Sequence, residues 1–131
     1  MKSVGLDTSV VVRLLTGDPQ TQAQTARAFL ADCRTSHTRV YVSDLVVAQT
    51  YYALIYHYDA SKPDVVKALL AFLRHPGLHP TGHAVDVLSE YAGTGPGLVD
   101  RLIRSDLLDK ADEVVTFDAD FAKLHKTRRL A

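Results

Sequence analysis

Short β-branched segments alternate with stretches of helical periodicity along this chain, and this alternation limits its fold more than any other feature. Strands are predicted over residues 2–6, 39–43, 78–80 and 113–116. Helices are predicted between and after them, over residues 10–15, 20–33, 44–58, 61–73, 83–91 and 98–108, with a short one after residue 120. The pattern predicts an α/β fold, a three-layer α/β/α sandwich with a mostly parallel central sheet.

The length and composition predict one domain over residues 1–131. No apolar tract reaches the roughly 18 residues of a membrane span, and Asp7 interrupts any signal-peptide core, so we expect a soluble, cytoplasmic protein. Cys33 stands alone and is predicted to be a small core residue.

Basic and acidic residues number 15 each, which argues against a protein that coats nucleic acid. A local basic patch is possible in the C-terminal run 123–129, where the alternative is a solvated chain end.

Aspartates follow the first and the last predicted strands. Asp7 comes directly after residues 2–6, and Asp118 follows residues 113–116, while Asp100 begins a helix and Asp120 lies one turn beyond Asp118. Ligands of parallel α/β sheets bind beyond the carboxyl ends of the strands, so these acids can converge. Two carboxylates about 4 Å apart repel by roughly 4 kcal/mol at an effective dielectric of 20, which a divalent cation such as Mg²⁺ or Mn²⁺ relieves. Helix capping by each aspartate is the structural alternative.

Two other motifs lack the residues that their possible functions would require. The glycine cluster at 93–97 lacks the lysine and the spacing of a phosphate-binding loop. A phosphatase with Asp7 as nucleophile would need a second aspartate two residues later, where Ser9 stands.

The tyrosine and histidine side chains are best explained by packing within the protein or exposure to solvent. Tyr51, Tyr52 and Tyr56 share helical spacing, which is typical of a core or dimer interface, with stacking on RNA bases as the alternative. The six histidines lack the paired spacing of a zinc helix.

Four segments in order, GLDTSVVVRLL, VSDLVVAQTYYAL, GLVDRLIRS and VVTFDADFAKL, resemble the motifs of the PIN-domain ribonucleases, in particular the VapC-type toxins of toxin–antitoxin pairs. The resemblance covers nearly the whole chain. It implies that Asp7, Asp100 and Asp118 are catalytic metal ligands for Mg²⁺ or Mn²⁺. Asp120 would be a further candidate, with Thr116 and Ser9 as supporting hydroxyl groups.

The resemblance also implies an activity and partners. The expected reaction is metal-dependent hydrolysis of RNA phosphodiesters by a toxin of a VapBC-type system. The expected partners are the RNA substrate, a small antitoxin and a second copy of the chain in a homodimer.

One position departs from the family pattern. Gln49 stands where the motif would carry glutamate, and a carboxamide keeps an oxygen donor but loses the charge, so metal affinity should fall. Asp44, five residues earlier, is better explained as a helix cap than as a replacement for that glutamate. The alternative function is therefore a catalytically inactive PIN-like module that binds RNA or a protein partner.

Overall fold

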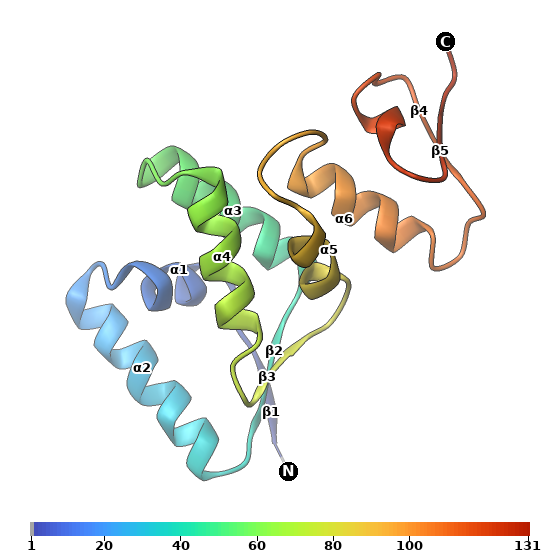
Figure 1. Ribbon diagram of the computed structural model, residues 1–131. Helices are drawn as coiled ribbons and strands as arrows, with labels where there is room; N and C mark the ends of the chain where they lie inside the picture. The colour runs from blue at the N-terminus through green and yellow to red at the C-terminus, as the bar shows by residue number, and fades with distance from the viewer. Residues whose placement is uncertain (1) are drawn as a thin grey trace.

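Three short strands form a parallel sheet in the middle of the chain's main body. In the computed structural model, which describes residues 2–131, β1 (Ser3–Gly5), β2 (Arg39–Val42) and β3 (Leu78–Pro80) lie in the order β1-β2-β3 (Figure 1). Val4 is paired with Val40, and Val40 in turn with Leu78. Each crossover between these strands contains helices, as parallel neighbours require. β1 is therefore an edge strand whose second side has no strand partner among the described residues.

The six helices begin and end where local sequence signals favour it. They are α1 (Thr8–Thr16), α2 (Gln20–Thr35), α3 (Asp44–His57), α4 (Lys62–Leu73), α5 (Ala84–Glu90) and α6 (Leu98–Leu107). The side chains of Asp7, Ser43 and Ser61 accept hydrogen bonds from the free amides at the starts of α1, α3 and α4. Gly17 ends α1 in the left-handed conformation that a residue without Cβ adopts easily.

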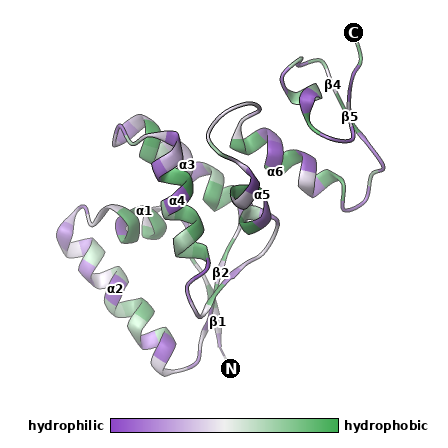
Figure 2. Ribbon diagram, viewed as in Figure 1, coloured by the Kyte–Doolittle hydropathy of each residue, from purple (hydrophilic) through white to green (hydrophobic). Residues whose placement is uncertain are grey.

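The core lies around α4, which packs against α3, α5 and β3. Leu69 of α4, Val47 of α3 and Leu88 of α5 are all at most 1% exposed. Figure 2 shows hydrophobic residues gathered on α1, α3 and α4, while much of α2 is hydrophilic. Cys33 is buried in this core, which confirms its predicted role. The core thus holds the sheet and the starts of α1 and α3 in fixed relative positions.

A separate C-terminal unit, residues 114–129, stands beyond α6. It consists of β4 (Val114–Thr116), the 3₁₀ helix η1 (Phe121–Lys123) and β5 (Thr127–Arg129). β4 and β5 pair in parallel as a sheet of their own, well away from β1, β2 and β3 in Figure 1. β5 was not predicted, because a three-residue strand with two arginines carries no apolar alternation.

The α/β class and the parallel pairing of strands are confirmed. The division of the strands into two sheets was not predicted, since sequence patterns do not say which edge a strand joins. Within residues 2–131, every helix is too short or too polar to cross a bilayer.

Candidate acidic site

Asp7 lies directly beyond β1 and caps α1. Its Oδ1 accepts hydrogen bonds from the Ser9 hydroxyl at 2.6 Å, the Ser9 amide at 3.0 Å and the Val10 amide at 3.4 Å. The Ser9 hydroxyl, followed by the Val10 amide, lowers the pKa of Asp7, so this exposed carboxylate is charged at neutral pH. Asp7 is therefore a helix cap, as the structural alternative predicted. The cap uses only Oδ1, so Oδ2 has no hydrogen bond among the described residues and is open to a ligand.

Gln49 lies next to this helix start. Its Oε1 accepts a hydrogen bond of 2.6 Å from the hydroxyl of Thr8, the residue that follows Asp7. The contact joins α3 to α1 across 41 residues of chain and holds the exposed amide beside the acid. A glutamate at this position would share the same location, so the departure from the family motif removes a charge close to Asp7.

Asp100 lies half-buried in the first turn of α6. The pKa of Asp100 is raised, first by burial and then by the negative charges of Asp118 and Asp120. These two acids belong to the C-terminal unit, so the structure brings α6 and that unit into electrostatic range of each other. An acid whose charge is opposed in this way is a candidate for binding a cation or a proton.

Asp118 is exposed in the turn that follows β4. Its amide donates to the Thr116 hydroxyl at 3.0 Å, and its Oδ1 accepts from the Asp120 amide at 2.9 Å. Asp120 in turn forms an exposed ion pair of 2.9 Å with Lys123. Thr116 thus shapes the turn that presents Asp118, while Asp120 is already engaged by a cation of its own segment.

The acids fall into two groups. Asp7 lies with Gln49 at the end of β1, whereas Asp100 lies in the first turn of α6, within range of the charges of Asp118 and Asp120. Within residues 2–131, no three side chains of the His, Cys, Asp or Glu types are placed to hold one metal ion together. Within one chain, Asp7, Asp100 and Asp118 are therefore not grouped as a metal centre of three carboxylates.

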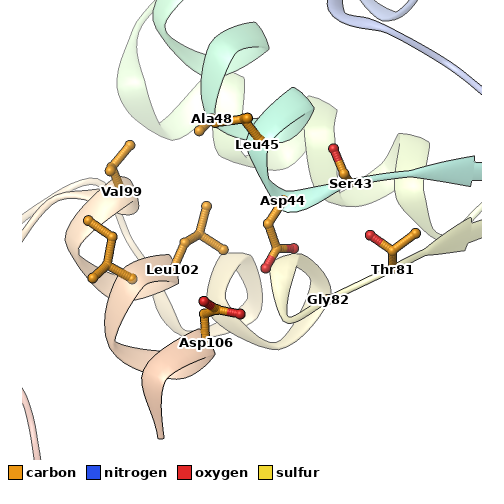
Figure 3. Close-up of a pocket in the computed structure, with 10 residues that line it drawn as sticks. Ser43, Asp44, Leu45, Ala48, Thr81, Gly82, Val99, Leu102 and Asp106 are labelled. Atoms are coloured by element: carbon orange, nitrogen blue, oxygen red, sulfur yellow. The ribbon is translucent and has the colours of Figure 1, made fainter. Parts of the chain in front are cut away.

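Asp44 lies in a different place, a pocket of ≈ 400 Å³ between α3, the turn at Thr81 and Gly82, and α6 (Figure 3). Its carboxylate accepts from the amides of His83 at 3.0 Å and Ala84 at 3.1 Å. Asp44 is a cap, as predicted, but it caps α5, while Ser43 caps its own helix. The pocket is mainly apolar, with Val99 and Leu102 in its wall, and it contains none of Asp7, Asp100 and Asp118.

His83 pairs with an acid that the sequence pattern did not predict. Its Nε2 lies 2.8 Å from Asp109 Oδ2, and this hydrogen bond raises the pKa of the imidazole. The two residues are 26 positions apart, so no local spacing could have revealed the pair.

The tyrosine stripe of α3 divides between core and surface. Tyr51 is buried, with its hydroxyl 3.2 Å from that of Tyr91, which supports the packing interpretation for this residue. Tyr52 and Tyr56 are exposed and stacked, with ring centroids 5.8 Å apart and planes inclined by 18°. These two rings present a flat apolar surface to solvent.

The comparisons with known proteins identify the family. A search of curated proteins returned no match. The family model described as "PIN domain" matches residues 4–126, a range that includes Asp7, Gln49, Asp100 and Asp118. Since this match spans nearly the whole chain, from β1 to the end of the turn before β5, the chain belongs to the PIN domain family.

Proposed function

We propose that this protein is an endoribonuclease that hydrolyses RNA phosphodiesters at an acidic centre made of Asp7, Asp100 and Asp118. PIN domains as a family are nucleases that act on RNA and generally depend on divalent metal ions. The observation that carries the proposal is the position of the acids within the matched range. Asp7 and Asp118 each lie two residues beyond the end of a strand. The negative charge of Asp118 contributes, after burial, to the raised pKa of Asp100.

The chain's own residues support this chemistry in specific ways. Ser9 orients the Asp7 carboxylate through Oδ1, and Thr116 shapes the turn that presents Asp118. Mg²⁺ or Mn²⁺ is the proposed cofactor, because oxygen ligands without cysteine suit these ions and a bound ion would activate water and offset phosphate charge. Asp120 is a secondary candidate, since its pairing with Lys123 competes with a cation.

The biological setting that we propose is that of a VapC-type toxin. Such a protein would act in the cytoplasm, would be restrained by a small antitoxin and would form a homodimer. The support is the ordered set of four motifs together with the family match over residues 4–126.

The decisive experiment measures cleavage of a mixed RNA pool by purified protein with Mn²⁺, with and without EDTA. We expect cleavage that EDTA stops and that Asp7→Asn and Asp118→Asn each abolish. Asn remains a good helix cap, so Asp7→Asn should keep the fold. Asp64→Asn, an acid in the first turn of α4, is the matched control that should cleave normally. Cleavage that survives both site variants would refute the proposed centre.

A second candidate function is favoured by one observation. Gln49 offers a neutral amide beside Asp7, hydrogen-bonded to Thr8, where a carboxylate would complete the charge of the site. An inactive PIN module that binds RNA or protein would show no cleavage in its natural form. If Gln49→Glu then cleaves RNA while the natural chain binds it intact, the binding function is the correct one.

A further inference from the structure

Four strands of the described chain, β1, β3, β4 and β5, have an edge on which no other strand pairs. β1 pairs only with β2, and β4 pairs only with β5. β1 and β4 both pair in parallel and both are three residues long. Unpaired edges offer rows of free amide and carbonyl groups that another strand can join.

The C-terminal unit is held away from the β1 of its own chain. The guanidinium of Arg104 in α6 donates to the His125 carbonyl at 2.7 Å, which fixes the unit to the far part of α6. Hydrogen bonds from the amides of Lys110 and Ala111 to the Leu107 carbonyl close the connecting turn. Figure 1 shows the unit projecting from α6 with the central sheet on the other side of that helix. In this arrangement the edge of β4 is available to a different molecule.

One parallel register between β1 and β4 places the aspartates that follow the two strands side by side. Asp7 lies two residues beyond Gly5, the end of β1, and Asp118 lies two residues beyond Thr116, the end of β4. Aligning the two strand ends in parallel sets Asp7 opposite Asp118, at the spacing of about 4.8 Å between neighbouring strands.

The same register matches apolar side chains. It sets Val115 beside Val4 and Phe117 beside Leu6, on one face of the joined sheet, because successive side chains alternate. Val115 and Phe117 are 49% and 70% exposed, which is unusual for residues of this size. Pairing would remove both from water.

A groove at the end of β1 includes Leu6, the residue that this register sets beside Phe117. It has a volume of ≈ 570 Å³ and is lined by Leu6, Val10 and Ala26, with Phe29 at 42% exposure on its rim. Arg13 also lines it, and after the Ser9 and Val10 hydrogen bonds its positive charge lowers the pKa of Asp7. No element of the described chain fills it.

We propose that two copies of this chain exchange their C-terminal units, so that β4 of each copy extends the sheet at β1 of the other and each acidic site is shared between them. The site then consists of Asp7 from one copy and of Asp100 and Asp118 from the other, which the single chain keeps apart. The crowding of three carboxylates in such a site is relieved by a divalent cation. The inference rests on the proposed function for the role of the site, while the exchange itself stands on the strand edges and the groove.

The exchange is tested first without any activity measurement. Two differently tagged chains on a Cys33→Ser background are coexpressed, one with Gly5→Cys and the other with Thr116→Cys. A side chain at Gly5 has room, since its Cβ would approach no atom closer than 4.0 Å. Mild oxidation should give a disulfide-linked dimer that carries both tags. A chain that carries both cysteines should give linked dimers as well, and a closed monomer would overturn the exchange. Absence of any disulfide would overturn the pairing of β1 with β4.

Complementation then tests the shared site. Asp7→Asn and Asp118→Asn are each expected to be inactive alone, but chains coexpressed in equal amounts should recover about one quarter of the natural rate. About half of randomly assorted dimers are mixed, and each mixed dimer has one intact site of two. Asp7→Asn coexpressed with the double variant Asp7→Asn/Asp118→Asn is the control without recovery. Linked dimers of the cysteine variants without recovery by the complementing chains would refute the shared site. Linked dimers of the cysteine variants together with a natural chain that never cleaves RNA would refute only the nuclease function.

Discussion

Removal of the Asp44 carboxylate tests whether this acid, about 40 residues away in the chain, stabilises the start of α5. The same variant tests whether Asp44 takes part in catalysis. Asp44→Ala leaves the amides of His83 and Ala84 without their acceptor. Hydrogen bonds to charged groups contribute about 1.5–3 kcal/mol each, and the partial exposure of this site lets water replace part of that. We therefore expect a loss of about 2 kcal/mol in the free energy of unfolding, within the upper range for a lost cap.

The assay is thermal and urea unfolding followed by circular dichroism. For a chain of this length, about 2 kcal/mol corresponds to a fall in Tm of roughly 6–12 °C. Asp86→Ala is the matched control, because this exposed acid in the first turn of the same helix makes no side-chain hydrogen bond among the described residues. Its loss should cost less than about 1 kcal/mol. Equal Tm values for the two variants would refute the cap. Loss of RNA cleavage by Asp44→Ala at unchanged stability would show instead that Asp44 replaces the missing glutamate.

Three further outcomes follow from other contacts. Gln49→Glu should tighten Mn²⁺ binding by about tenfold in calorimetry, because ligand charge sets the affinity of oxygen sites; equal or weaker binding contradicts this role. Thr50→Val should raise the free energy of unfolding by about 1 kcal/mol, since the fully buried Thr50 hydroxyl has no hydrogen-bond partner within residues 2–131; a lower Tm would show that the hydroxyl is satisfied. The raised pKa of His83 implies stability that is complete below the unfolded value of about 6.5 and lost as pH rises through the folded value. Tm should therefore fall as pH rises above about 6.5 and through the higher pKa of folded His83, and Asp109→Asn should remove that fall.

Local signals in the sequence were sufficient for most of the secondary structure. Ser61 followed by a proline and an acid predicts the start of α4, and the structure begins that helix at Lys62. The strand at 78–80 was also predicted correctly. These elements depend on neighbours a few residues away, which the sequence displays directly.

Contacts between distant residues could not be predicted in the same way. The hydrogen bond between Thr8 and Gln49 spans 41 positions, and that between Asp44 and Ala84 spans 40. Asp44 carries every mark of a cap for the helix that it begins, yet its carboxylate serves another helix. Spacing along the chain has no information on which helix end lies opposite a given carboxylate.

The sequence by itself determined the α/β class, the starts of the helices after α1 and the identity of the acids, because propensity, capping and side-chain chemistry are local properties. Only the tertiary structure decided which acids share a neighbourhood. Asp100 meets the charges of Asp118 and Asp120, whereas Asp7 remains at the free edge of β1. The physical reason is that strand partners are chosen by packing and edge hydrogen bonds over the whole molecule, and here β4 pairs with β5 and leaves β1 open.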